Sequence, residues 1–410
     1  MNRTMVKLLG KYLKGFLKEA TIGPAFKLTE AVFELIVPLV MAQIIDVGVA
    51  NGDTGYVLRM GGVMILLGVV GLCCALVCQY FASKASQGVG TVMRNDMFRH
   101  ISTLSHAEID RIGTPSLINR ITNDVNQLQT AVAMLIRLVI RAPFLVIGAT
   151  VMAISIDWKM SGIFLVAMVL IALALYLIMS RSIPFFKVVQ RLLDKISLIT
   201  RENLEGVRVI RAFSRQETEK TRFSEACEEQ SNTAIRVGKL SALLNPLTYI
   251  IVNLAIVAII WFGGYQVDGG ELTQGKLIAL VNYMTQIMLA MVVVANLVVI
   301  FTRAAASAAR VNEIFSVQSS IVPGEKEVQA VSGTPRVEWK DVSFAYMGSE
   351  EYALEHVTLS VAAGETVGVI GGTGAGKSTL VNLSPRFYDV SEGALLGDGV
   401  DVRGCPFAQL

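Results

Sequence analysis

The stretch MGGVMILLGVVGLCCALVCQYFAS, Met60–Ser83, contains no Asp, Glu, Lys or Arg and is long enough to cross a lipid bilayer as a helix. Three further stretches share this property: Met160–Ser180, Leu240–Val267 and Leu277–Thr302. A spanning helix needs about 20 consecutive, mostly apolar residues. These four windows therefore predict transmembrane helices.

Two weaker windows complete the set. Leu138–Ile156 carries one charge, Arg141, near its start, whereas Ile22–Val47 contains Lys27, Glu30, Glu34 and Asp46. A helix lying in the membrane interface is the alternative for Ile22–Val47. We count it as a span because six spans give a consistent topology and five do not. The prediction is a bundle of six membrane helices.

The overall composition agrees with a membrane protein. Of the 410 residues, 53% are hydrophobic and 17% are charged, whereas soluble domains contain about 25% charged residues. This excludes a single soluble core, and such hydrophobicity also excludes a disordered chain. The net charge of +3 gives no reason to expect a nucleic-acid partner. The five cysteines form no CxxC pair and no disulfide pattern.

The basic residues orient the spans, because Lys and Arg favour the cytoplasmic side. The connection between the fourth and fifth windows carries 12 of them, from Arg181 to Lys239. The N-terminus and the connection after Met60–Ser83 are also basic. The other three connections are short, near Gly48–Tyr56, Asp157–Lys159 and Gly264–Gln274, and Lys159 is their one basic residue. Both termini are therefore predicted to be cytoplasmic, in a multi-pass protein of the cytoplasmic membrane. The basic, amphipathic residues 1–20 predict an interfacial lead-in helix rather than a signal peptide.

The two long inner connections show helical spacing, for example at Leu192, Ile196, Ile199 and Leu204. We expect the membrane helices to continue into the cytoplasm. The alternative, a separate soluble insertion, is disfavoured because neither stretch has enough apolar residues for its own core.

A second pattern begins after Phe315. The polar, Gly- and Pro-containing stretch Ser316–Pro335 predicts a linker. Alternating apolar residues then predict two β-strands, the first with Val337, Trp339, Val342, Phe344 and Tyr346, the second with Val357, Leu359 and Val361. A buried strand is predicted at Thr366–Ile370, directly before a glycine-rich loop.

This loop fits the phosphate-binding pattern G-x-x-x-x-G-K-[ST], with the residues Gly371, Gly372, Thr373, Gly374, Ala375, Gly376, Lys377, Ser378 and Thr379. Glycines let successive backbone N–H groups point at one phosphate, and a helix starting near Lys377 adds its positive end. The pattern predicts that Lys377 reaches the β- and γ-phosphates and that the Ser378 hydroxyl binds Mg²⁺. A merely flexible loop would leave the Lys-Ser-Thr run unexplained.

Six spans followed by a phosphate-loop domain resemble one half of an ATP-binding-cassette (ABC) exporter. Thr114–Val125 and Arg201–Phe213 resemble the two intracellular loops that dock onto the nucleotide domains of that family. Ala305–Ile314 resembles the exit from its sixth span, and Asp389–Arg403 the segment after its phosphate loop.

The resemblance implies an all-α six-helix transmembrane domain followed by a partial α/β P-loop ATPase domain. The expected parts are the lead-in helix 1–20, the membrane domain 21–315, the linker 316–335 and the nucleotide-binding part 336–410. It also implies ATP and Mg²⁺ as ligands. The implied partners are a lipid bilayer, a small-molecule cargo and a second half-transporter. Arg141–Pro143 and Trp261–Gly264 resemble bacterial multidrug exporters that work as heterodimers, which slightly favours a heterodimer.

In this family an aromatic residue upstream of the phosphate loop stacks on adenine, and Tyr346 occupies that position. Stacking on a base is worth roughly 1–3 kcal/mol. The alternative is a strand-end aromatic residue that fills a small core.

The sequence also departs from the family pattern. The glutamine loop, the Leu-Ser-Gly-Gly-Gln signature, the acidic Walker B strand with its catalytic glutamate and the switch histidine do not occur between Lys377 and Leu410. His356 precedes the phosphate loop, so we do not assign it the switch role. We therefore expect a truncated half-transporter that binds nucleotide weakly at best and does not hydrolyse it.

Two polar stripes in the spans are candidates for a substrate path: Asn245, Tyr249 and Asn253 in the fifth span, and Asn282, Gln286 and Asn296 in the sixth. Each set falls on one helix face. A translocation cavity and hydrogen bonding between helices remain equally open explanations.

Three functions stay open at this point. The leading one is an ATP-driven exporter half for amphipathic or drug-like compounds, with lipids or peptides as alternative cargo. The second is a chain that inserts without transporting. The third, a membrane-anchored P-loop kinase or regulator, predicts only one or two spans, so the six-span count argues against it.

Overall fold

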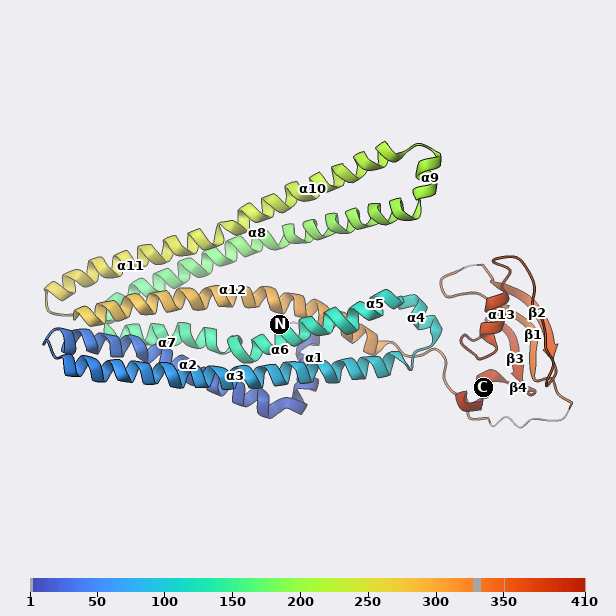
Figure 1. Ribbon diagram of the computed structural model, residues 1–410, viewed down its shortest axis with the longest axis horizontal. Coiled ribbons are helices and arrows are strands. Elements are labelled where there is room, and N and C mark those ends of the chain that lie inside the picture. Colours follow the sequence, from blue (N-terminus) through green and yellow to red (C-terminus); the bar gives the residue numbers. More distant parts are fainter. Residues whose placement is uncertain (1–2, 327–332, 350, 410) are drawn as a thin grey trace. The chain divides into compact units, whose positions relative to one another are not determined.

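The computed structural model describes residues 3–326, 333–349 and 351–409. Within these residues, six helical segments are long and apolar enough to cross a membrane (Figure 1). They are Arg3–Val49, Thr54–Ile101, Thr114–Ile156, Trp158–Glu205, Gln216–Asp268 and Gln274–Ser316. The predicted six-helix membrane region is confirmed, including the weak first span.

Several of these segments consist of more than one helical element. The first contains α1 (Arg3–Leu13), η1 (Lys14–Phe16), α2 (Leu17–Gln43) and η2 (Ile44–Val49), and the second is α3 (Thr54–Ile101). After the short α4 (His106–Ile112), the third contains α5 (Thr114–Asn119), η3 (Arg120–Asp124), α6 (Val125–Met134), η4 (Leu135–Val139) and α7 (Arg141–Ile156). The fourth segment is α8 (Trp158–Glu205), the fifth contains α10 (Gln216–Ala242) and α11 (Leu244–Asp268), and the sixth is α12 (Gln274–Ser316). The short α9 (Val207–Ala212) lies between the fourth and fifth segments.

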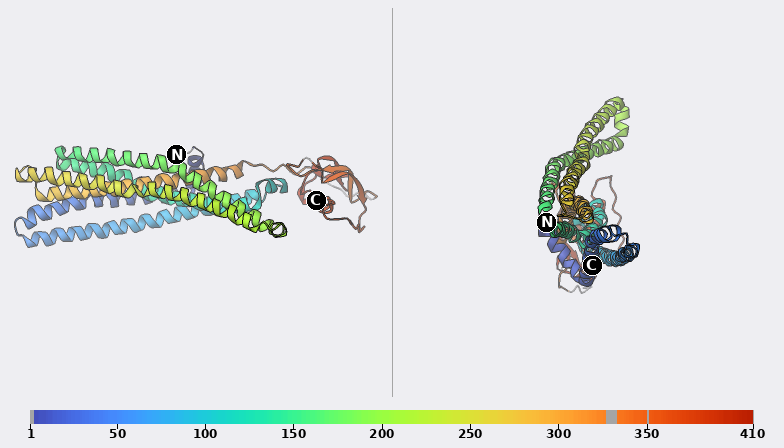
Figure 2. Two further views of the ribbon diagram at one scale, coloured as in Figure 1. Left: turned by 90° about the horizontal axis from the view of Figure 1, so that it is seen from above. Right: turned by 90° about the vertical axis from the view of Figure 1, so that its left-hand side faces the viewer.

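The chain divides into two compact units. One contains Met1–Leu17, Lys84–Ala133 and Ile300–Leu410, and the other contains Lys18–Ser83 and Met134–Val299. In the second unit, α10 and α11 pack along α8 (Figure 2). The single helix α8 runs from the apolar window through the basic stretch to Glu205. The expected helical continuation of the spans is therefore correct.

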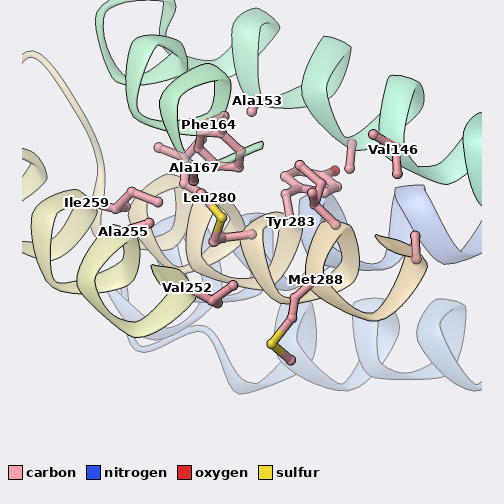
Figure 3. Close-up of a cluster of buried hydrophobic side chains, with 14 of the residues drawn as sticks. Val146, Ala153, Phe164, Ala167, Val252, Ala255, Ile259, Leu280, Tyr283 and Met288 are labelled. Atoms are coloured by element: carbon pink, nitrogen blue, oxygen red, sulfur yellow. The ribbon is translucent and has the colours of Figure 1, made fainter. Parts of the chain in front are cut away.

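The core of the second unit joins α2, α7, α8, α11 and α12 (Figure 3). Large side chains such as Phe164, Ile259 and Tyr283 are fully buried among small ones such as Ala149 and Ala279. Small residues let membrane helices approach closely, so van der Waals contacts hold them together in lipid.

A proline interrupts the backbone hydrogen bonding of α2 within this core. Pro38 has no N–H, so the carbonyl of Glu34, four residues earlier, loses its helical donor. Gln286 of α12 donates its Nε2–H to that carbonyl at 3.1 Å, and the Tyr283 hydroxyl donates to the carbonyl of Leu35 at 2.6 Å. Two side chains one turn apart on α12 thus bind the carbonyl groups of α2 next to Pro38.

Of the four charges that weakened the first predicted span, Lys27, Glu30 and Glu34 are in ion pairs, and Asp46 accepts hydrogen bonds from the Thr273 hydroxyl and the Gly275 N–H. Lys27 and Glu30 form an ion pair at 2.6 Å, and Arg141 of α7 contacts Glu34 at the same distance. Charged groups in lipid are tolerated when they pair inside the bundle. Pairing explains how α2 can carry these residues and still span the membrane.

The part of the chain after α12 forms a small antiparallel sheet. Its strands are β1 (Val337–Phe344), β2 (Leu354–Val361), β3 (Glu392–Gly397) and β4 (Val400–Asp401), in the order β2-β1-β3-β4. Helix α13 (Lys377–Leu383) buries Leu380 and Leu383 against Trp339, Val342 and Phe344 of β1. Two short 3₁₀ turns, η5 (Val402–Gly404) and η6 (Phe407–Gln409), follow. The two strands predicted from alternation are confirmed.

The predicted buried strand at Thr366–Ile370 is wrong. These residues form no strand and are exposed, with Ile370 exposed to 95%. An apolar segment becomes a buried strand only when neighbouring strands pair with it, and no strand among the described residues does so. Helix α12 ends at Ser316, as expected at the start of the linker. Residues 327–332 of the predicted linker lie outside the described residues.

Candidate functional site

The phosphate-loop motif forms a turn that leads directly into α13. Gly374 and Gly376 have φ angles of +85° and +80°, in the left-handed region that glycine adopts without strain. A Cβ on Gly376 would also lie 2.7 Å from the carbonyl oxygen of Ala353. Glycine is therefore required at position 376 for both conformation and space.

Lys377 is the first residue of α13. Its Nζ donates to the carbonyl oxygens of Gly371 and Gly372 at 2.9 and 2.6 Å, so the ammonium group lies over the loop. Apart from each glycine and its two chain neighbours, no atom of the described residues lies within 4 Å of the Cβ position at Gly372 or Gly374, so space is open there. A cation, a glycine turn and open space together fit a phosphate chain.

The loop also offers an oxygen ligand for a metal ion. Ser378 lies exposed in the first turn of α13, beside Lys377. Among the described residues, no group of three His, Cys, Asp or Glu side chains could hold a metal ion. A hydroxyl oxygen beside a phosphate cradle fits Mg²⁺, which is usually bound by few protein groups together with phosphate oxygens and water.

The aromatic residue expected to stack on adenine lies beside the loop. The Tyr346 hydroxyl is 3.0 Å from the Thr379 hydroxyl, and 37% of Tyr346 is exposed. Thr379 is buried. The structure therefore places Tyr346 against Thr379, the last residue of the motif, with which the sequence had assigned it to one site.

Sequence reasoning missed a second tyrosine at this site. The ring of Tyr388 lies 5.4 Å from that of Tyr346, and its hydroxyl donates to Asp110 at 2.6 Å. Burial and the Asp110 carboxylate raise the pKa of Tyr388, which keeps this hydroxyl protonated. Nothing in the local sequence links Asp110 to Tyr388, because the contact joins remote parts of the chain.

The polar stripes of the spans have different environments. Asn245, Tyr249 and Asn253 of α11 are exposed, whereas Thr248 and Val252, on the adjacent part of the same helix surface, are buried.

On α12, Asn282 and Asn296 are exposed, and Asn282 donates to the carbonyl of Ile278 within the same helix. Gln286 instead contacts α2 through the carbonyl of Glu34. The stripe on α12 thus combines exposed polar groups with one side chain that joins two helices.

Comparison with known families gives two matches. Residues 21–291 match the family described as ABC transporter transmembrane region, and residues 354–409 match ABC transporter. The first match runs from the first membrane helix into the sixth, and the second covers β2, the phosphate loop and α13.

Individual relatives show the same relationship. An uncharacterized ABC transporter ATP-binding protein of Mycobacterium tuberculosis (strain ATCC 25618 / H37Rv) is 36% identical over 402 residues, which are 97% of this chain and 69% of the relative. A protein of the same description from Bacillus subtilis (strain 168) is 32% identical over 96% of this chain and 69% of its own length. The ATP-dependent lipid A-core flippase of Vibrio parahaemolyticus serotype O3:K6 (strain RIMD 2210633) is 25% identical over 88% of this chain and 62% of its own length. With six apolar helices, a phosphate loop and these matches, the chain belongs to the ABC transporter family.

Proposed function

We propose that this chain is one half of an ATP-driven exporter. One observation carries the proposal: a phosphate cradle with Lys377 over it and Tyr346 beside it occurs in the same chain as six membrane helices. Nucleotide binding is the property that such a cradle supports best, and the helices are the part that nucleotide occupancy would move.

Each residue of the site has a distinct role in this proposal. The loop N–H groups and Lys377 bind the triphosphate, Tyr346 stacks on the base, and the Ser378 hydroxyl holds Mg²⁺ through an oxygen ligand. When bound, Mg²⁺ neutralises charge on the phosphates. Since Lys377 already contacts the carbonyls of Gly371 and Gly372, phosphate oxygens would replace those contacts with stronger, charge-assisted ones.

The proposed location is the cytoplasmic membrane, with both termini inside. The support is the distribution of basic residues, which are concentrated in the long connections 84–133 and 181–239 and at the N-terminus. The proposed parts are residues 1–20 at the interface, 21–315 as membrane domain, 316–335 as linker and 336–410 as part of the nucleotide domain.

The proposed partner is a second half-transporter, with a related chain slightly favoured over a second copy. The cargo would be a small amphipathic compound, which contacts the exposed polar faces of α11 and α12. A lipid is the second candidate, and one relative named as a lipid A-core flippase supports it.

The first test measures ATP binding to the purified chain. We expect Lys377→Ala to abolish binding, whereas Lys340→Ala, which removes an exposed lysine of β1, leaves it unchanged. Unchanged ATP affinity in Lys377→Ala contradicts the assigned site.

The second test measures ATP-dependent uptake of a fluorescent amphipathic compound into inside-out vesicles that contain the chain with its partner. Uptake that requires Lys377 supports the exporter. ATP binding without hydrolysis or uptake supports the alternative, a chain that inserts and does not transport.

A further inference from the structure

The tyrosine expected to stack on a nucleotide base belongs to a cluster of three aromatic rings. Tyr346 contacts Phe344 at 4.9 Å between ring centroids and Tyr388 at 5.4 Å, and both contacts are edge-to-face. Tyr388 also lies 5.5 Å from Phe344. Two edge-to-face neighbours restrict the rotation of the Tyr346 ring and thereby determine which face it offers to a ligand.

Tyr388 is in turn held by α4, which belongs to the first inner connection of the membrane region. Its hydroxyl donates to Oδ2 of Asp110 at 2.6 Å. The ring of His106, one turn earlier on α4, lies 4.6 Å from Phe387 and 6.0 Å from Tyr388. All of these residues belong to the same compact unit.

Helix α4 has its own anchor, so it can serve as a fixed support. Ser105 caps its first turn, in a capping box with Glu108. Glu108 also accepts from the backbone N–H of Ser320 at 3.3 Å, in the segment after α12. Glu108 is buried. The position of Asp110 is therefore determined by contacts independent of the phosphate loop.

We propose that Asp110 and Tyr388 are positioning residues for the nucleotide base: Asp110 holds the Tyr388 ring, and Tyr388 holds Tyr346 in the orientation that stacks on the base. The inference rests on the proposed nucleotide binding. It adds that a residue of the membrane region's inner connection determines how well the base is held. By thermodynamic linkage, base binding strengthens the contact between α4 and Tyr388 by the same factor.

The proposal separates the two parts of a nucleotide. Tyr346 contacts only the base of the nucleotide, whereas the cradle of residues 371–379 contacts only its phosphates. Loss of the Asp110–Tyr388 contact should therefore weaken ATP binding and leave inorganic tripolyphosphate binding unchanged.

The experiment measures equilibrium affinities of the full chain in detergent for ATP and for tripolyphosphate. We expect Tyr388→Phe to weaken ATP binding about threefold to tenfold, as expected for losing one hydrogen bond. Asp110→Asn should weaken ATP binding in the same direction, because an amide oxygen accepts the Tyr388 hydrogen bond more weakly than a carboxylate does. The affinity for tripolyphosphate should stay constant in both variants. Tyr352→Phe is the matched control, since it removes a tyrosine hydroxyl that donates to a carboxylate, Glu392 at 2.9 Å, outside the aromatic cluster. It should change neither affinity.

A double-variant comparison tests whether Asp110 affects ATP affinity through Tyr346. In a Tyr346→Ala background, where stacking is already lost, Asp110→Asn should cause no further loss of ATP affinity.

Two results would overturn the proposal: an equal loss of ATP and tripolyphosphate affinity in the Asp110 and Tyr388 variants, or an undiminished effect of Asp110→Asn in the Tyr346→Ala background. If the parent chain binds neither ligand, the proposed nucleotide site itself fails, and the inference fails with it.

Discussion

Replacement of Gln286 by leucine tests how α12 binds α2 at Pro38. Gln286 Nε2 donates to the Glu34 carbonyl, which has no helical donor because residue 38 is proline. Leucine is similar in size and cannot donate a hydrogen bond. In the variant, the Glu34 carbonyl therefore loses the Gln286 donor.

The magnitude follows from two opposing contributions. A buried acceptor left without a partner costs about 1–3 kcal/mol, but hydrogen bonds between membrane helices average only about 0.6 kcal/mol and reach about 1.7 kcal/mol. Gln286 Oε1 is itself buried without a partner among the described residues, so leucine also removes one unsatisfied group. We expect Gln286→Leu to lower the free energy of unfolding by about 1 kcal/mol.

Pro38→Ala provides the decisive comparison. Alanine restores an N–H at position 38, which can donate to the Glu34 carbonyl within α2. In that background, Gln286→Leu should cost close to nothing, which gives a coupling energy of about 0.5–1 kcal/mol between the two sites. Asn282→Leu is the control on the same helix, because Asn282 is exposed and donates to a carbonyl of α12 itself, at Ile278.

The assay is reversible unfolding in mixtures of SDS and a mild detergent, followed by circular dichroism, for the four combinations at positions 38 and 286. An equal cost of Gln286→Leu in both backgrounds would refute the argument that the proline creates the need for Gln286. An effect of Asn282→Leu as large as that of Gln286→Leu would show that any polar residue of α12 contributes similarly.

Three further predictions concern the first compact unit. Arg310 donates to Asp124 through two nitrogens, and the side chain of Asp124 is 3% exposed while that of Arg310 is 47% exposed. Asp124→Asn should therefore lower the free energy of unfolding by about 1–2 kcal/mol. The same detergent titration measures this loss, and an unchanged free energy of unfolding would show that solvent screens the pair. Burial alone would raise the pKa of Glu108, but hydrogen bonds from Ser105 and Ser320 outweigh it and lower that pKa. The stabilisation that the Glu108 carboxylate gives is present above its unfolded pKa of about 4.3 and is lost as the pH falls through its lower folded pKa. Proteolysis of the segment after α12 should therefore accelerate in acid. Glu108→Gln should remove this pH dependence. Gly376→Ala should reduce ATP affinity at least about tenfold, because the left-handed φ costs alanine about 1–2 kcal/mol and the new Cβ meets the Ala353 carbonyl. An equilibrium ATP affinity equal to that of the parent would contradict the argument that this turn requires glycine.

Features that depend on local chemistry were predicted correctly. The apolar windows became membrane helices, because a helix satisfies its own backbone hydrogen bonds in lipid. The motif 371–379 became a turn before α13, because its glycines and Lys377 carry the needed conformation and charge in consecutive residues. The alternating strands β1 and β2 were predicted for the same reason.

The error at Thr366–Ile370 has a physical cause. Its composition is that of a buried strand, yet a strand is stabilised by hydrogen bonds to neighbours that the segment itself does not contain. No strand among the described residues pairs with it, and it is exposed. Local composition can predict apolar character, whereas burial depends on remote segments.

The amino-acid sequence alone thus determined the membrane helices, the phosphate loop and the family resemblance, since each follows from residues that are close together in the chain. Only the tertiary structure showed that Gln286 binds the carbonyl freed by Pro38, and that Asp110 holds Tyr388 beside Tyr346. Those contacts join side chains from distant segments, and a hydrogen bond needs its two atoms within about 3 Å. Such proximity is a property of how helices and strands pack, which periodicity and motif spacing do not contain.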